Sequence, residues 1–356
     1  MESPSTDKSA VDRCGAELSR RLESIGATVR RLPRAGRGDH IRADFAGTGP
    51  RVLLLGHFDT VWPIGQLERQ PLREDAGRLH GPGVFDMKAG IAVSMLALRA
   101  LHELEGTDRP RITMLWTTDE EVGSGTSRAD IEALARECSV VLVLEPSLPG
   151  GAAKTSRKGC GEFELTVHGV SAHAGLDPGK GASAIHELAH QILAITALQD
   201  LDRGVTLNVG RISGGSRTNV VADVARASID VRVLTLEDAA AVEAQLRALR
   251  PVLTGTRLEL DGGVDRPPLE RNAGVIRLYE IARGVAGELG KDLAEGVAGG
   301  GSDGNFTAAI GVPTLDGLGP RGDGAHALHE YVELDDLAWR AAFLARLLSR
   351  LGREDY

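Results

Sequence analysis

The clearest pattern in this chain is an alternation of short apolar runs with longer amphipathic segments. Runs typical of strands buried on both faces occupy residues 52–55, 112–116 and 140–144. Apolar residues recur at helical spacing over residues 89–104 and 338–351. This alternation extends over residues 10–154 and 272–352, so we expect an α/β fold with a mostly parallel sheet covered by helices.

A different pattern fills the middle of the chain. Residues 162–168, 205–212, 224–233 and 256–260 alternate as half-buried strands do, whereas residues 184–198 and 236–249 have helical spacing. The resulting order is β-α-β-β-α-β, which is the ferredoxin-like split βαβ unit. We therefore predict one domain from residues 1–155 and 266–356, interrupted by an inserted domain of residues 156–265.

The first apolar run ends at a histidine. His57 follows it directly, and Asp59 comes two residues later. In an extended chain these two side chains lie on the same side. Asp59 is then able to contact the ring nitrogen that His57 does not give to a metal.

Other acidic and imidazole side chains occupy similar positions in the sequence. They stand just after apolar runs or in a loop near the C-terminus: Asp86, Glu120, Glu121, Glu145, His326 and His329. Ligands of parallel sheets bind outside the carboxyl ends of the strands, which is where these acids fall. Two histidines with several carboxylates suit two zinc ions that keep a position open for water.

Charge and length narrow the alternatives. The formal net charge of -9 argues against a nucleic-acid partner, because phosphate binding needs a basic surface. A chain of 356 residues is long enough for two domains. The first residues lack the apolar core of a signal peptide, and no run reaches the roughly 20 apolar residues of a membrane helix. We expect a cytoplasmic protein without membrane contact.

A glycine-rich segment at residues 299–305 offers a competing interpretation as a phosphate-binding loop. It lacks the Lys-Ser/Thr of a P-loop and the downstream acid of a dinucleotide fold. Close backbone approach beside the site explains the glycines better. We expect this segment to open a helix that Ser302 or Asp303 caps.

Taken together, the motifs resemble the two-zinc M20 metallopeptidase family, and within it the glutamate carboxypeptidases of the carboxypeptidase G2 type. The segments that carry the resemblance are His57-x-Asp59, Gly83-x-x-Asp86-x-Lys88, Glu120-Glu121-x-Gly123-Ser124, Glu145-Pro146, Ser171-Ala172-His173-Ala174-Gly175 and His326. They run in order along most of the chain. The family also includes acetylornithine deacetylases, succinyl-diaminopimelate desuccinylases and aminoacylases, among which these shared motifs do not choose.

The resemblance implies a role for each metal-site residue. Asp86 bridges two zinc ions, and its peptide bond to Met87 is expected to be cis. The other implied ligands are His57 on one zinc, Glu145 on the same or the paired zinc, His326 on the other, and Glu121. Glu120 is implied as general base. His326 is favoured over His329, because many family members have His-x-x-Asp/Asn-Glu here and His329 then stands at the Asp/Asn position.

The inserted domain is implied to act as a lid and dimerisation domain. By the same resemblance, His173 reaches the partner subunit's site in a homodimer and stabilises the oxyanion. Asn219 and Arg266 resemble residues that hold the substrate carboxylate. Arg266 offers the planar fork that suits such an anion. Arg217 is a further candidate, or a solvated loop charge.

We therefore expect zinc-dependent hydrolysis of the amide bond of N-acylated amino acids or short peptides. A metal-bridging hydroxide attacks, Glu120 is the base, and cobalt or manganese are alternative metals. An acetylornithine deacetylase, a succinyl-diaminopimelate desuccinylase or an aminoacylase is the alternative. More distant alternatives are a metal-binding module without catalysis and a nucleotide-binding protein.

Overall fold

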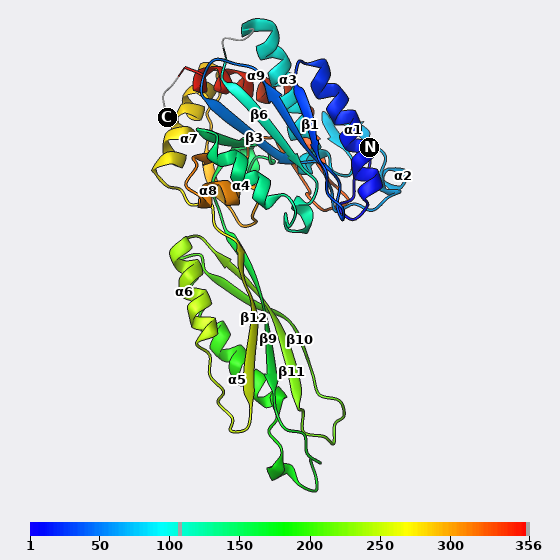
Figure 1. Ribbon diagram of the computed structural model, residues 1–356, viewed down its shortest axis with the longest axis vertical. Helices are drawn as coiled ribbons and strands as arrows, with labels where there is room; N and C mark the ends of the chain where they lie inside the picture. The colour runs from blue at the N-terminus through cyan, green and yellow to red at the C-terminus, as the bar shows by residue number, and fades with distance from the viewer. Residues whose placement is uncertain (106–108, 354–356) are drawn as a thin grey trace. The chain divides into compact units, whose positions relative to one another are not determined.

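The computed structural model describes residues 1–105 and 109–353. The chain divides into two compact units (Figure 1). The first comprises Met1–Ser156, Leu269–Ala298 and Ser302–Tyr356, and the second comprises Arg157–Pro268 and Gly299–Gly301. Within the described ranges, no helix has the length and apolar character needed to cross a membrane.

A six-stranded sheet forms the centre of the first unit. Its spatial order is β1 (Thr28–Leu32), β2 (His40–Phe45), β6 (Arg111–Thr117), β3 (Arg51–His57), β7 (Val140–Val143) and β14 (Thr314–Leu315). The last four are mutually parallel, whereas β2 is antiparallel to both of its neighbours. The predicted mostly parallel sheet is confirmed.

Helices cover both faces of this sheet. Alternate strand residues such as Leu54 pack with α1 (Lys8–Ser24), α3 (Ala89–Glu105), α7 (Ala273–Glu288) and α9 (Leu334–Leu351). Their neighbours, such as Leu53, pack on the other face with α4 (Arg128–Arg136) and α8 (Gly304–Ala309). Because both faces are buried, the strands are apolar throughout.

Smaller elements complete the first unit. A second sheet has the order β15 (Gly322–Asp323), β16 (Tyr331–Glu333), β5 (Arg78–His80) and β4 (Arg73–Asp75). β8 (Ala153–Arg157) pairs with β13 (Glu295–Ala298), and α2 spans Gln66–Arg69. Short helical turns occupy Val84–Lys88, Glu120–Val122 and Pro149–Gly151.

The second unit is an antiparallel sheet with two helices on one face. The strand order is β10 (Thr206–Gly214), β11 (Val224–Val233), β9 (Gly159–His168) and β12 (Arg257–Arg266). α5 (Ala184–Thr196) and α6 (Leu236–Arg247) pack on it, and a short turn spans Pro178–Lys180. The predicted β-α-β-β-α-β order is confirmed. β12 continues to Arg266, beyond the predicted end at residue 260. Gly262 and Gly263 still pair with β9, and the register shifts between Gly263 and Arg266, as is common where a strand contains glycine.

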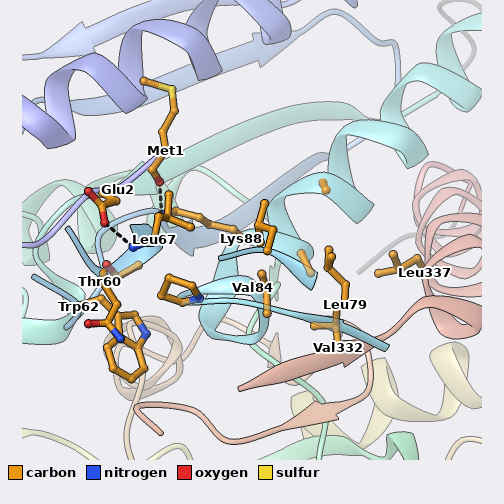
Figure 2. A pocket seen from close by; sticks show the side chains of 15 residues that line it. Met1, Glu2, Thr60, Trp62, Leu67, Leu79, Val84, Lys88, Val332 and Leu337 are labelled. Atoms are coloured by element: carbon orange, nitrogen blue, oxygen red, sulfur yellow. Dashed lines mark hydrogen bonds between the residues drawn. The ribbon is translucent and has the colours of Figure 1, made fainter. Parts of the chain in front are cut away.

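The N-terminal residues line a mostly apolar cavity of about 260 Å³ in the first unit, shown in Figure 2. The Lys88 ammonium donates a hydrogen bond to the carbonyl oxygen of Met1 at 2.9 Å. The Glu2 carboxylate accepts one from the Leu67 amide at 2.8 Å. Lys88, which belongs to the motif around Asp86, therefore contacts the N-terminal segment.

Candidate functional site

The candidate site lies at the carboxyl ends of three adjacent parallel strands. β3 ends at His57, which stands level with Thr117 at the end of β6. On the other side of β3, Leu55 stands level with Val143 at the end of β7. The loops that leave β6 and β7 carry Glu121 and Glu145, so the sheet order brings both beside His57.

His57 is buried, with 1% of its surface exposed. Its Nε2 atom lies 3.2 Å from Oδ1 of Asp86 and 3.4 Å from Oε1 of Glu145. Burial acts to lower the pKa of His57, but the surrounding carboxylates outweigh it and hold that pKa well above its usual value. These three side chains form a first donor group.

A second donor group lies on the other side of Asp86. The Nε2 atom of His326 is 3.0 Å from Oε2 of Glu121 and 3.4 Å from Oδ2 of Asp86. The imidazole is 52% exposed and stands in the loop between β15 and β16, with a positive φ of 61°. Asp86 and Glu121 raise the pKa of His326 to about 10.

Asp86 is shared by the two groups, with one carboxylate oxygen facing each histidine. Burial opposes its ionisation, but His326 and His57 hold the pKa of Asp86 below its usual value. Its peptide bond to Met87 is cis, as the family resemblance implied.

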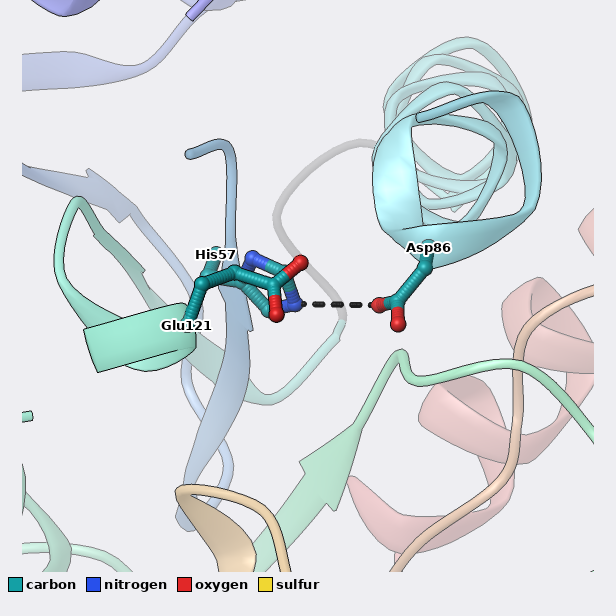
Figure 3. Close-up of side chains that lie close together, drawn as sticks. All are labelled: His57, Asp86 and Glu121. Atoms are coloured by element: carbon teal, nitrogen blue, oxygen red, sulfur yellow. Dashed lines mark hydrogen bonds and ion pairs between the residues drawn. The ribbon is translucent and has the colours of Figure 1, made fainter. Parts of the chain in front are cut away.

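Figure 3 shows His57, Asp86 and Glu121 pointing toward one another; one donor atom from each lies within 4.8 Å of the others. Burial raises the pKa of Glu121, against the hydrogen bond with His326. Within the part of the chain that the structure describes, Oε1 of Glu121 is buried without a hydrogen-bond partner. An unsatisfied buried oxygen beside two imidazoles fits a site that holds a cation.

Asp59 contacts the opposite edge of the His57 ring. Nδ1 of His57 lies 3.1 Å from the backbone oxygen of Asp59 and 3.4 Å from its Oδ1 atom. Oδ2 of Asp59 accepts hydrogen bonds from the Ser5 hydroxyl at 2.7 Å and the Glu121 amide at 3.3 Å. A proton on Nδ1 is thereby favoured, so Nε2 is the ring nitrogen that loses its proton when a metal binds.

Two of the remaining predicted residues differ in their surroundings. Glu120 precedes Glu121 in the turn Glu120–Val122 and is half-buried. His329 is exposed, whereas His326 faces the carboxylates. The structure therefore brings His326 to the cluster in preference to His329.

In the second unit, the structure brings His173 and Asn219 together. The Ala174 amide donates to the backbone oxygen of Asn219 at 3.0 Å, and the Arg217 oxygen accepts from the Val220 amide in the same loop. Nδ1 of His173 accepts hydrogen bonds from the amides of residues 175 and 176, both at 3.1 Å. A neutral His173 ring consequently carries its proton on Nε2, where it is able to donate.

Arg266 lies at the other end of the same sheet. It pairs with Cys160 at the start of β9, whereas the loop of His173 follows the end of β9 at His168. At roughly 3.3 Å per residue these ends are about 26 Å apart. Within one chain, Arg266 and Asn219 are too distant to hold the same carboxylate. Arg266 is 8% exposed, and its side chain packs against the backbone of Gly301. The close backbone approach predicted for the glycine-rich segment is therefore an approach of Gly301 to the Arg266 side chain.

The sequence did not reveal Ser5 as a supporting residue of the site, and it gave Asp303 a different role. No pattern in the sequence indicates that the Ser5 hydroxyl contacts Asp59. Of the two predicted caps of α8, Asp303 occupies the N-cap position but makes no capping hydrogen bond, whereas the Ser302 hydroxyl accepts one from the Gly304 amide at 3.1 Å. The Asp303 carboxylate instead accepts hydrogen bonds from the hydroxyls of Thr117 and Ser124, which flank the turn bearing Glu120 and Glu121.

Comparison with known proteins identifies the family. Residues 53–350 match the family described as peptidase family M20/M25/M40. The chain belongs to this family. Carboxypeptidase G2 of Pseudomonas sp. (strain RS-16) is 31% identical over 360 residues, which cover 99% of this chain and 87% of that protein. Succinyl-diaminopimelate desuccinylase of Nitrosospira multiformis is 30% identical over 348 residues, which cover 91% of this chain and 89% of that protein. As an M20 family member, the chain is a hydrolase.

Solved structures agree on the fold. Aminopeptidase PepT from Bacillus cereus superposes with a TM-score of 0.84 at 23% identity, over 99% of this chain and 95% of that chain. The YxeP protein of Bacillus subtilis, a dinuclear metal-binding peptidase of the M20 family, has a TM-score of 0.71 at 15% identity, over 99% and 94% of the two chains. At these identities, the likeness establishes the shared fold.

Proposed function

We propose that this M20 family member is a two-zinc amidohydrolase that releases a free amino acid from an N-acylated amino acid or short peptide. The observation that carries the proposal is the sharing of Asp86 between two donor groups, each with one histidine and one glutamate. The names of the two sequence relatives, a carboxypeptidase and a desuccinylase, support hydrolysis of this kind.

Donor spacing supports a metal in each group. Two ligand atoms on one tetrahedral zinc, each at about 2.0–2.2 Å, lie about 3.3–3.6 Å apart. The imidazole nitrogens and carboxylate oxygens that face one another around Asp86 are 3.0 to 3.4 Å apart. Small movements of these side chains would therefore make room for an ion. His57 and Glu145 would hold one ion, His326 and Glu121 the other, and Asp86 both. Imidazole and carboxylate ligands also suit cobalt and manganese. Bound metal would lower the pKa of water and polarise the scissile carbonyl.

Glu120 is proposed as the general base. Its place next to Glu121 in the turn Glu120–Val122 supports a carboxylate near the five residues that face one another around Asp86, among which Glu120 itself is not counted. In this role it takes a proton from the attacking water and gives it to the leaving amine. Asp59 acts through His57, because it keeps the Nε2 lone pair directed at the cluster.

Recognition of the substrate carboxylate is assigned to Arg266, with Asn219 and Arg217 as further polar contacts. Charge-assisted hydrogen bonds from a guanidinium suit a free α-carboxylate. His173 is assigned to the oxyanion, because its Nε2 is free to carry the donated proton. Arg266 lies far from His173 and Asn219 within one chain. This separation supports a site in which one chain contributes Arg266 and its partner contributes His173 and Asn219.

A homodimer through the second unit meets that requirement. β10 is an edge strand of its sheet, and its second half is exposed, with Ile212 at 67%. Edge strands present unpaired amides and carbonyls, and a two-fold contact uses the same edge on both chains.

We also propose a cytoplasmic location, which the three cysteines without disulfide bonds support.

A second candidate is a desuccinylase, which the 30% identical relative favours. The discriminating experiment is a hydrolysis screen of N-acetyl, N-succinyl and aminobenzoyl amino acids with zinc, cobalt and manganese. The proposal expects turnover of acyl-amino acids with a free α-carboxylate. A strong preference for N-succinyl substrates favours the desuccinylase. Metal binding without amide turnover of any substrate would contradict both.

A further inference from the structure

Glu330 is a fully buried glutamate in the segment that follows His326, with 0% of its surface exposed. Three backbone amides donate to its carboxylate. Oε2 accepts from Gly83 at 2.7 Å, and Oε1 accepts from Phe85 at 2.9 Å and from Asp86 at 3.0 Å. The carboxylate of Glu330 thus holds the turn that carries the shared ligand candidate.

A fourth donor comes from a third segment. The indole Nε1 of Trp62, shortly after Asp59, donates to Oε2 of Glu330 at 2.9 Å. Each carboxylate oxygen therefore accepts two hydrogen bonds, which suits the ionised form of a buried carboxyl group. One side chain connects the segments of His57 and Asp59, of Asp86, and of His326.

The contacts to residues 85 and 86 bear directly on ligand geometry. Fixing two successive amides fixes the backbone from which the Asp86 carboxylate projects. That carboxylate faces His57 with one oxygen and His326 with the other, so a shift of its backbone disturbs both donor groups. Loss of a partner that orients a ligand typically lowers metal affinity about 10- to 100-fold.

We propose that Glu330 is a positioning residue of the metal centre, which sets Asp86 relative to His57 and His326. Its loss weakens metal binding on both sides of Asp86, whereas loss of a terminal ligand weakens one side. The inference rests on the proposed function in that the cluster around Asp86 must bind metal.

Glu187 provides a matched control. It is also 0% exposed, and its carboxylate accepts hydrogen bonds from the amides of Val252 and Leu253 and from the side chains of Gln191 and Thr256. None of these partners is a candidate ligand. Replacement of Glu187 by glutamine makes the same chemical change at a buried loop anchor of the second unit.

The experiment measures zinc affinity of metal-depleted protein by competition with a chromophoric chelator. Glu330→Gln is expected to lower the affinity for both zinc equivalents about 10- to 100-fold, the usual range for a lost partner of a ligand. Glu187→Gln is expected to keep wild-type affinity. In the metal-free protein, amide hydrogen exchange at Phe85 and Asp86 should be faster in Glu330→Gln than in wild type.

Trp62→Phe serves if Glu330→Gln does not fold, because it removes one donor and leaves the three backbone contacts. A several-fold loss of zinc affinity is then expected, and unchanged affinity overturns the role. Wild-type affinity in folded Glu330→Gln, or equal losses in Glu330→Gln and Glu187→Gln, also overturns it. Absence of zinc binding by the wild-type protein would instead overturn the proposed function together with this role.

Discussion

The Nε2 atom of His57 lies 3.2 Å from the Oδ1 atom of Asp86, although the two residues are 29 positions apart. One stands at the end of a buried parallel strand, and the other in the short turn before α3. Since the second Asp86 oxygen faces His326, one carboxylate belongs to two donor groups. The proposed two-metal chemistry rests on this sharing of Asp86.

Substitutions of the adjacent residues Glu120 and Glu121 are expected to affect different properties, turnover in one case and zinc content in the other. Glu120→Gln should retain two zinc ions per chain and lose about 10²- to 10⁴-fold in turnover, because it removes a base and no ligand. Glu121→Gln should lower the zinc content, because Glu121 faces His326 in the second donor group. Metal analysis by mass spectrometry, alongside amide hydrolysis, measures both. Full zinc content in Glu121→Gln with loss of zinc in Glu120→Gln would reverse the two roles.

Much of this cluster is predictable from sequence. The apolar runs before His57 and Glu145 predict strands, and carboxyl ends of parallel strands meet at one edge. The partner of Glu145 was not predictable, because it depends on strand order. β7 lies next to β3, and this places Glu145 3.4 Å from His57.

Glu330 shows why other parts could not be predicted. Three of its four partners are backbone amides roughly 245 positions away in the chain. Every residue except proline carries such a donor, so no side-chain pattern records the contact. Asp303 was assigned to the nearest helix terminus, but its partner Thr117 ends β6 and its partner Ser124 lies in the loop that follows. Long-range polar contacts of this kind require the fold.

Metal binding should release protons. In the metal-free protein the pKa of His326 is raised to about 10 and that of His57 well above its usual value, so both rings are protonated at neutral pH. A metal ligand must be neutral imidazole, and zinc therefore displaces a proton from each ring. Zinc affinity should rise with pH up to about 10. Calorimetry in two buffers of different ionisation enthalpy tests this; identical observed enthalpies and pH-independent affinity would contradict it.

Arg266→Ala should raise the Michaelis constant for substrates with a free α-carboxylate. Loss of the charge-assisted hydrogen bonds corresponds to roughly 2 to 3 kcal/mol of binding. Amide and ester analogues of the same substrates should change little, because they lack the anion. Steady-state kinetics on paired substrates measures the difference. Equal losses on charged and uncharged substrates would remove Arg266 from the carboxylate pocket.

Mixed dimers test whether His173 serves the partner's site. His173→Ala and Glu120→Gln are each expected to be inactive alone. After subunit exchange, a heterodimer holds one site with both groups intact, so activity should return. Exchange is verified with differently tagged chains. A mixture that stays inactive after verified exchange, or full activity of a monomeric wild-type protein, would exclude the shared site.

The central claim is that two metal ions lie on either side of Asp86. Anomalous diffraction from zinc-loaded crystals at the zinc edge tests it most directly. The account predicts two anomalous peaks per chain, one contacted by His57 and Glu145, the other by His326 and Glu121, with Asp86 contacting both. A single peak, a peak held by His329 in place of His326, or peaks away from Asp86 would contradict it.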